Sequence, residues 1–293
     1  MDPLELVKLT ALMERTLGKP EVVIGLIDGP VVTDHESLSS VVIRKASNTS
    51  DGECSRVDSF ACQHGTFVAG ILSAQRGSPA PAICPNCTLF VRPIFAESSS
   101  ALDMPTAQPE ELADGIVDSI NAGARVLNIS AAIQQPSLKS ERVLEDALNH
   151  AAKRDVIVVA AAGNQGTVGS TAITRHPWVI PVVACNASGR PLNHSNLGHS
   201  IGRKGLGAPG EHITSLAPGN RVVTSGGTSV ATPFVTGAIA LLWSEIPGVS
   251  GAAMRLAVTQ GYASRRTSVV PPLLDAWSAY QNLRSSSAGR WLS

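Results

Sequence analysis

Short apolar runs of strand length alternate with segments of helical periodicity along most of the chain. The runs that we interpret as buried strands lie at residues 21–27, 88–94, 125–129, 156–161 and 178–185. They are nearly continuous in apolar side chains, which is typical of parallel strands covered by helices on both faces. Apolar residues that repeat every three or four positions predict helices over 4–17, 64–73, 110–122, 140–154, 229–245, 252–260 and 273–283. This alternation predicts an α/β fold with a three-layer, doubly wound and mostly parallel sheet.

Two stretches of the chain lack either pattern. Residues 32–62 are polar and irregular, and residues 186–227 are rich in loop-forming residues, so we expect a surface excursion and a long loop region there. The sequence contains no internal repeat and no linker that would divide it. We therefore expect an N-terminal helix and lead-in over 1–20, a single folded domain over 21–283 and a flexible tail over 284–293.

Composition narrows the class of protein. Of 293 residues, 43% are hydrophobic and 16% are charged, which indicates a compact globular chain. The 23 basic and 23 acidic side chains balance, so no cationic excess attracts nucleic acid or anionic lipid. The longest apolar runs, 156–162 and 178–185, are far shorter than the roughly 20 residues of a membrane helix. Residues 1–20 carry charges and no secretory signal core, which predicts a cytoplasmic location.

The five cysteines leave several roles open. Because the count is odd, at least one thiol stays outside any intramolecular disulfide. Cys84 and Cys87 have the spacing of a metal or redox pair, but a zinc site needs a second pair of ligands. Only the scattered Cys54, Cys62 and Cys185 remain to supply one. Cys54 and Cys62 lie eight residues apart in a polar stretch, where a disulfide would instead pin a loop.

Three polar residues stand where an open α/β sheet forms its sites, in the loops between strand ends and helices. Asp28 follows the first buried strand, and His64 and Ser229 each stand at the start of a predicted helix. Taken singly, each has an ordinary explanation: a turn aspartate, a polar residue at a helix start and a helix N-cap serine. Together they follow the order Asp, His, Ser, with separations of 36 and 165 residues. Subtilisins have that order.

The segments around these residues strengthen the comparison. They read LIDG at 26–29, HGTFVAG at 64–70, AAGN at 161–164, GTSVATP at 227–233 and, near the end, LDAWSAY at 274–280. In this order they resemble the signature blocks of the subtilisin-like serine proteases, the subtilase family. The resemblance runs from about residue 20 to residue 283, and it implies a subtilisin-like catalytic domain that cleaves peptide bonds.

The resemblance implies a role for each matching residue. Ser229 would be the nucleophile, His64 the general base that takes its proton, and Asp28 the carboxylate that orients the imidazole. Asn164 matches the family's side-chain donor to the oxyanion, and the N–H of Ser229 would be the second donor. This division of roles suits the chemistry, because a serine hydroxyl is a weak nucleophile unless a base removes its proton.

The resemblance also implies how a substrate binds. In this family an extended peptide pairs with an exposed strand edge, here expected over 127–132, with Ser130, Ala131, Ala132 and Gly163 as substrate-binding residues. The two alanines stand where relatives often carry Leu-Gly or Gly-Gly, so we expect a narrowed pocket and a small residue before the scissile bond. Residues 71–87 contain no Asp or Glu to serve as ligands in the calcium loop of many relatives, so we expect no required metal or other cofactor.

Within the family, the stretches 27–31 (IDGPV) and 87–95 (CTLFVRPIF) resemble the PatA-type proteases of cyanobactin maturation, which cut a leader from a ribosomally made precursor peptide. We therefore predict a serine endopeptidase whose partner is a precursor peptide or another extended polypeptide. A general degradative or housekeeping subtilase is the alternative within enzymes. An inactive subtilase fold that binds a peptide is the alternative from another class. A macrocyclase would need an added lid, for which residues 96–109 are short.

Overall fold

The computed structural model contains a seven-stranded sheet in the order β2-β3-β1-β5-β7-β8-β9, and every neighbouring pair of its strands is parallel. The structure describes residues 1–46, 54–95, 106–130, 132–133, 138–259 and 267–288. The strands of the sheet are β1 (Val23–Asp28), β2 (Ile43–Lys45), β3 (Thr88–Pro93), β5 (Ala124–Ile129), β7 (Ile157–Ala161), β8 (Val179–Cys185) and β9 (Leu206–Pro209). The predicted parallel α/β sheet is thus confirmed.

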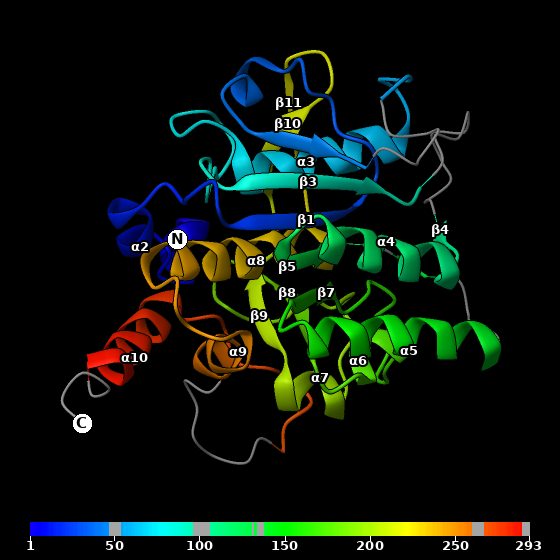
Figure 1. Ribbon diagram of the computed structural model, residues 1–293. Helices are drawn as coiled ribbons and strands as arrows, with labels where there is room; N and C mark the ends of the chain where they lie inside the picture. The colour runs from blue at the N-terminus through cyan, green and yellow to red at the C-terminus, as the bar shows by residue number, and fades with distance from the viewer. Residues whose placement is uncertain (47–53, 96–105, 131, 134–137, 260–266, 289–293) are drawn as a thin grey trace.

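Helices cover both faces of the sheet (Figure 1). One face packs against α3 (Phe60–Ser73) and α8 (Thr228–Glu245), and the other against α4 (Pro109–Asn121) and α5 (Leu138–Lys153). Alternate residues of β1 enter the two cores, so that Leu26 lies in the first and Ile27 in the second. Burial on both sides explains why the central strands are apolar at nearly every position. The three-layer prediction is confirmed.

The single N-terminal helix predicted over 4–17 is wrong. Two short helices form instead, α1 (Pro3–Leu6) and α2 (Thr10–Arg15). Between them Lys8 has a φ of 53°, a left-handed conformation that a continuing α-helix cannot accommodate. The break lets both Leu9 and Leu12 reach the first core, where neither is exposed.

The irregular excursion predicted over 32–62 contains three ordered pieces. A 3₁₀ turn, η1 (Glu36–Leu38), precedes β2, which pairs with β3 at the edge of the sheet. Helix α3 already begins at Phe60, because the Ser59 hydroxyl caps it by accepting a hydrogen bond from the N–H of Cys62. A three-residue, partly exposed strand has no apolar run, so the sequence pattern did not predict it.

The long loop predicted over 186–227 is also wrong in part. It contains α7 (His199–Lys204), β9 and an antiparallel hairpin of β10 (Ile213–Ala217) and β11 (Arg221–Ser225). Strand β10 packs against α3, whereas all five residues of β11 are exposed. These elements are four to six residues long, too short for a period to stand out from neighbouring turn residues.

The remaining elements lie at the periphery. Strands β4 (Thr106–Ala107) and β6 (Ala132–Ile133) form a small separate sheet, and α9 (Gly251–Thr259) and α10 (Ala276–Ala288) follow α8. Helix α10 starts three residues later than the predicted helix over 273–283 and continues to residue 288, so it takes up the first half of the predicted tail over 284–293. Residues 289–293 lie outside the described part of the chain. The proposed domain boundaries stay a prediction.

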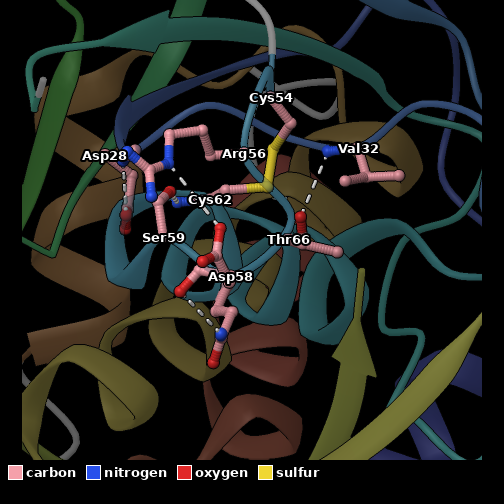
Figure 2. Close-up of a disulfide and its surroundings, with 10 residues drawn as sticks. Asp28, Val32, Cys54, Arg56, Asp58, Ser59, Cys62 and Thr66 are labelled. Carbon is pink, nitrogen blue, oxygen red and sulfur yellow. Dashed lines mark hydrogen bonds and ion pairs between the residues drawn. A yellow bond between two sulfur atoms is a disulfide. The ribbon is translucent and has the colours of Figure 1, made fainter. Parts of the chain in front are cut away.

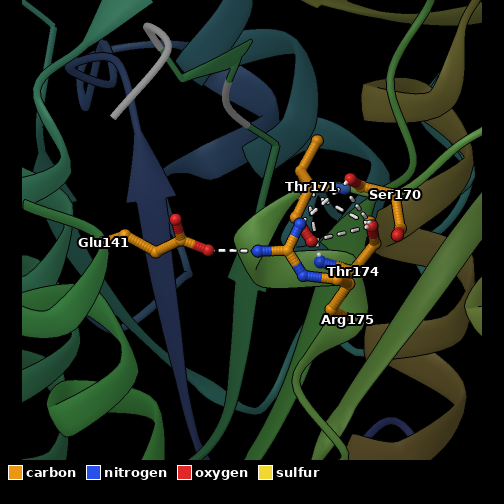
Figure 3. Close-up of polar contacts among 5 residues, drawn as sticks. All are labelled: Glu141, Ser170, Thr171, Thr174 and Arg175. Carbon is orange, nitrogen blue, oxygen red and sulfur yellow. Dashed lines mark hydrogen bonds and ion pairs between the residues drawn. The ribbon is translucent and has the colours of Figure 1, made fainter. Parts of the chain in front are cut away.

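The short helix α6 (Ala172–Arg175) is linked to α5 by polar side chains (Figure 3). Its start is a capping box in which Thr171 and Thr174 exchange side-chain and backbone hydrogen bonds. From its end the Arg175 guanidinium forms an ion pair with Glu141 of α5. The contact is half exposed, so we assign it to orientation of the helices rather than to much stability.

One of the open cysteine alternatives is now decided. Cys54 and Cys62 form a disulfide that joins the preceding loop to the first turn of α3 (Figure 2). Cys84, Cys87 and Cys185 are free thiols and are buried. Among the described residues no group of three or more His, Cys, Asp or Glu gathers as a metal site would require. None of the described helices is long and apolar enough to cross a membrane.

Candidate active site

Asp28 ends the central strand β1 at its carboxyl end, where it is completely buried between β3 and β5. Its Oδ1 accepts a hydrogen bond of 2.6 Å from the N–H of Gly29. A carboxylate in such a place is costly unless its charge is balanced by donors or by a cationic partner. The partner is a side chain from α3.

His64 of α3 supplies that partner. Its Nδ1 lies 2.6 Å from Oδ1 of Asp28, and its side chain is 15% exposed. The residue does not open the helix as the sequence pattern indicated, since α3 begins four residues earlier at Phe60. The extra turn brings the Phe60 ring over the imidazole, with centroids 5.9 Å apart and planes inclined by 23°. The imidazole is therefore held by the carboxylate at its Nδ1 and by an aromatic ring at its face.

Two glycines allow α3 to come this close to the end of β1. A Cβ at Gly65 would lie 2.4 Å from the carbonyl oxygen of Gly29, and a Cβ at Gly29 would lie 2.0 Å from that of Ala61. The Thr66 hydroxyl adds a direct link by accepting a 3.1 Å hydrogen bond from the N–H of Val32 (Figure 2). Any residue larger than glycine at either position would push α3 away from the end of β1.

Two opposed effects set the basicity of His64. Burial lowers the pKa of its imidazole, whereas the charge of Asp28 and the hydrogen bond to it raise that pKa by more. The pKa of His64 therefore lies above its ordinary value of 6.5. The carboxylate favours the imidazolium, which is the form that a general base reaches after it has accepted a proton.

Ser229 is the second residue of α8, the helix that packs against α3. The N-cap is Gly227 with a φ of 121°, and no side chain caps the helix, so the simpler interpretation of Ser229 as an N-cap serine is wrong. Ser229 itself is half-buried. It stands in the first turn of α8, where backbone N–H groups point out of the helix and favour negative charge.

Asn164, in the loop after β7, is attached to the same turn. Its Oδ1 accepts hydrogen bonds from the N–H of Thr228 at 2.9 Å and from the Thr228 hydroxyl at 3.0 Å. The N–H of Gly163 donates to that hydroxyl at 3.2 Å. Because the carboxamide oxygen is engaged, Nδ2 is the group that Asn164 has left to offer a ligand. Thr228 thus fixes the direction of the carboxamide beside Ser229.

The predicted substrate-binding segment is only partly as expected. Residues 127–129 belong to β5, which is a central strand between β1 and β7, so they cannot offer a free edge. Ala132 lies in β6 and pairs with β4. Ala131 is outside the described residues. Ser130 is 5% exposed, and its hydroxyl donates to the carbonyl oxygen of Ser229 at 3.1 Å.

Several residues that organise the site carried no assigned role in the sequence analysis. Asn196 holds the loop after β7 by accepting hydrogen bonds from the N–H groups of Gln165 and Thr167. Asn128 and Thr236 are fully buried and hydrogen-bonded to each other at 2.9 Å. An isolated Asn or Thr has no sequence signal of its own, because its function depends on partners from distant segments.

Comparison with known proteins gives a consistent result. The model of the subtilase family matches residues 19–268. Subtilisin Savinase of Lederbergia lenta is 30% identical over 250 residues, which cover 85% of this chain and 86% of that protein. A thermophilic serine proteinase of Bacillus sp. (strain AK1) is 32% identical over 248 residues, covering 84% and 57% of the two chains. The chain spans about half to three fifths of the length of this proteinase and of two further curated relatives.

Solved structures extend the comparison. The patellamide maturation protease PatA superposes with a TM-score of 0.76 at 29% identity, over 92% of this chain and 98% of that one. The prenylagaramide maturation protease PagA gives a TM-score of 0.79 at 26% identity, over 94% and 98%. The macrocyclase domain of PatG has a TM-score of 0.82 but only 21% identity, over 97% and 98%, and so shows the shared fold alone.

Proposed function

Because this chain belongs to the subtilase family of serine endopeptidases, we propose that it cleaves a peptide bond through an acyl-enzyme formed on Ser229. The observation that carries the proposal is the 2.6 Å contact between the buried Asp28 carboxylate and the imidazole of His64. His64 belongs to α3, which packs against α8, the helix that bears Ser229. An imidazole oriented by a carboxylate and a serine in the first turn of a neighbouring helix are the groups that acyl transfer uses.

In the proposed reaction, His64 takes the hydroxyl proton of Ser229 as the oxygen attacks the substrate carbonyl. The imidazolium is stabilised by Asp28 and then gives the proton to the leaving amine, which departs as the new N-terminus. Water, activated by the same imidazole, hydrolyses the acyl-enzyme and releases the new carboxyl terminus. Asp28 orients the imidazole and does not itself accept the proton.

The oxyanion that forms on the substrate carbonyl needs donors in fixed positions. We assign this role to Nδ2 of Asn164 and to the N–H of Ser229. The hydrogen bonds from Thr228 to the Asn164 oxygen support this assignment, because they hold the carboxamide in one orientation before substrate arrives. Ala131, Ala132, Gly163 and the backbone of Ser130, whose hydroxyl is bound to Ser229, remain our proposal for the residues beside the bound peptide. Residues 21–283 remain our proposal for the catalytic unit.

We further propose that the substrate is a ribosomally made precursor peptide and that the cut removes its leader. The likeness to PatA at 29% identity and to PagA at 26%, each over more than nine tenths of both chains, supports this choice. A general degradative role is the second candidate. It is supported by curated relatives named as alkaline proteases, which match the chain at 30% identity.

Two measurements test these proposals. A fluorophosphonate probe should label the wild-type protein at Ser229 and fail to label Ser229→Ala; absence of labelling in both would leave an inactive peptide-binding fold. Mass spectrometry should then show one cut in a precursor peptide and little cleavage of casein. Rapid degradation of casein at many sites would instead favour the degradative role.

A cytoplasmic location belongs to the same proposal. The Cys54–Cys62 disulfide is a bond more typical of oxidising compartments. Cell fractionation combined with thiol labelling of the two cysteines measures both the location and the state of this bond in the cell.

A further inference from the structure

We propose that a chain of three buried side chains positions Ser229 for catalysis. The inference rests on the proposed role of Ser229 as the nucleophile. The three side chains, which we call the Ser229 relay, are Thr236 of α8, Asn128 of β5 and Ser130 just after β5. None of them is more than 5% exposed. We regard them as positioning residues, which act through the backbone of Ser229.

The need for such a relay arises within α8 itself. In an α-helix, the carbonyl oxygen of each residue accepts the N–H of the residue four positions later. Four positions after Ser229 stands Pro233, which has no N–H to donate. Pro233 is the sixth residue of α8, beyond the first turn in which proline costs nothing. The carbonyl of Ser229 therefore lacks its regular helical partner.

The hydroxyl of Ser130 takes the place of that missing donor. Its Oγ lies 3.1 Å from the carbonyl oxygen of Ser229. Because Ser130 follows the end of β5, this bond fixes the first turn of α8 to the carboxyl end of a central strand. The backbone of a catalytic residue is thus held by a strand that is paired on both sides, which is a rigid reference point.

The rest of the relay fixes the direction of this bond. The Nδ2 group of Asn128 donates to Oγ of Ser130 at 2.8 Å, which leaves the hydroxyl hydrogen of Ser130 for Ser229. The Oδ1 of Asn128 in turn accepts from the Thr236 hydroxyl at 2.9 Å. The Thr236 hydroxyl also lies 3.3 Å from the carbonyl oxygen of Thr232, and its shorter contact with Asn128 turns the Asn128 carboxamide so that Nδ2 faces Ser130.

Fixing one atom of Ser229 affects its catalytic groups. The carbonyl carbon, the N–H and the side chain all branch from the same Cα, and the N–H and Oγ are the groups we assign to oxyanion binding and to attack. Loss of this bond would leave the carbonyl of Ser229 without the donor that replaces its missing helical partner, and it would let the turn rotate. We expect slower acylation with little change in ligand affinity.

The test measures fluorophosphonate labelling of Ser229, resolved into an affinity and a maximal rate. Ser130→Ala should lower the maximal rate about tenfold and leave the affinity within about twofold. Thr236→Val keeps the shape of the side chain without its hydroxyl and should act in the same direction, whereas Thr236→Ser keeps the hydroxyl and should label like the wild type. Thermal unfolding of each variant separates slow labelling from loss of folded protein.

A double-variant cycle tests whether the Ser130 hydroxyl acts through the carbonyl of Ser229 rather than through general stability of the fold. Pro233→Ala restores an N–H four residues after Ser229, so removal of the Ser130 hydroxyl should matter less in that background. Equal losses from Ser130→Ala in both backgrounds, or labelling by Ser130→Ala as fast as by the wild type, would overturn the relay. If the wild type itself is not labelled, the proposed function and the relay are both wrong.

Discussion

The Nδ1 of His64 lies 2.6 Å from Oδ1 of a carboxylate, Asp28, that has no exposed surface. The two residues come from the end of β1 and the second turn of α3, and the packing of glycines between these elements makes the contact possible. The contact has a measurable consequence. It raises the pKa of His64 above 6.5 although burial alone would lower that pKa.

Activity should accordingly increase with pH through an inflection above 6.5, because the base must be neutral to accept a proton. In Asp28→Asn the lowering effect of burial is no longer opposed, so the inflection should move to lower pH. The maximal kcat should fall by a factor on the order of 10⁴, as the imidazole loses its tautomer and its counter-charge. The dependence of kcat/KM on pH from 5 to 9 measures both effects. An unchanged inflection in the variant would contradict the assigned pair.

Two substitutions of Asn164 separate its proposed catalytic role from its structural one. Asn164→Ala removes both the Nδ2 donor and the Oδ1 acceptor that Thr228 binds. Asn164→Asp loses the Nδ2 donor but keeps an oxygen that can accept from Thr228. Both should lower kcat by about 10²–10³, the magnitude known for an oxyanion donor in subtilisin itself. Only Asn164→Ala should also lower the unfolding temperature. Normal kcat in Asn164→Asp would exclude Nδ2 from oxyanion binding.

Gly227→Ala should impair both stability and activity. Gly227 has a φ of 121°, and a Cβ there would lie 3.1 Å from Nδ2 of Asn164. The strained backbone should lower the free energy of unfolding by about 1–3 kcal/mol, and displacement of Asn164 should lower kcat. Gly248→Ala is the matched control, because a Cβ at that exposed turn meets no atom within 4 Å. Thermal unfolding and labelling of Ser229 in both variants provide the comparison.

The Cys54–Cys62 disulfide should stabilise the fold at the entrance to α3. It closes a loop between cysteines eight positions apart, for which the loss of unfolded-chain entropy corresponds to about 2–3 kcal/mol. We expect the double variant Cys54→Ser, Cys62→Ser to lose this amount in urea unfolding. Dithiothreitol should weaken the wild type to the same level and leave the variant unchanged. If dithiothreitol also destabilises the double variant, the loss of stability does not come from reduction of the Cys54–Cys62 disulfide.

Lys204 should make stability depend on pH in the alkaline range. Burial, followed by the nearby charges of Arg255 and Arg203, lowers the pKa of Lys204 from 10.5 to about 7. Between these values the unfolded chain holds a proton that the folded protein has released, so the free energy of unfolding should rise as pH increases from 7 to 10.5. Lys204→Met should show a smaller rise. The exposed Lys153→Met serves as the control, and urea unfolding across this pH range is the measurement.

The sequence by itself determined the class of fold and the candidate catalytic residues. Strands buried on both faces must be apolar at nearly every position, so β1, β3, β5, β7 and β8 could be predicted from local pattern. The candidates Asp28, His64, Ser229 and Asn164 could be named because each stands in a short segment whose letters resemble the family. That information is contained within a few neighbouring residues.

Tertiary structure alone decided the relations between distant segments. Three features depend on packing partners far away in the chain. Strand β5 is paired on both sides, the three-residue β2 forms the edge of the sheet, and α1 and α2 separate at Lys8. The same holds for the hydrogen bond from the Ser130 hydroxyl to the carbonyl of Ser229. A hydroxyl takes the partner that the folded chain places within 3 Å or so, and that partner is 99 residues away in the sequence.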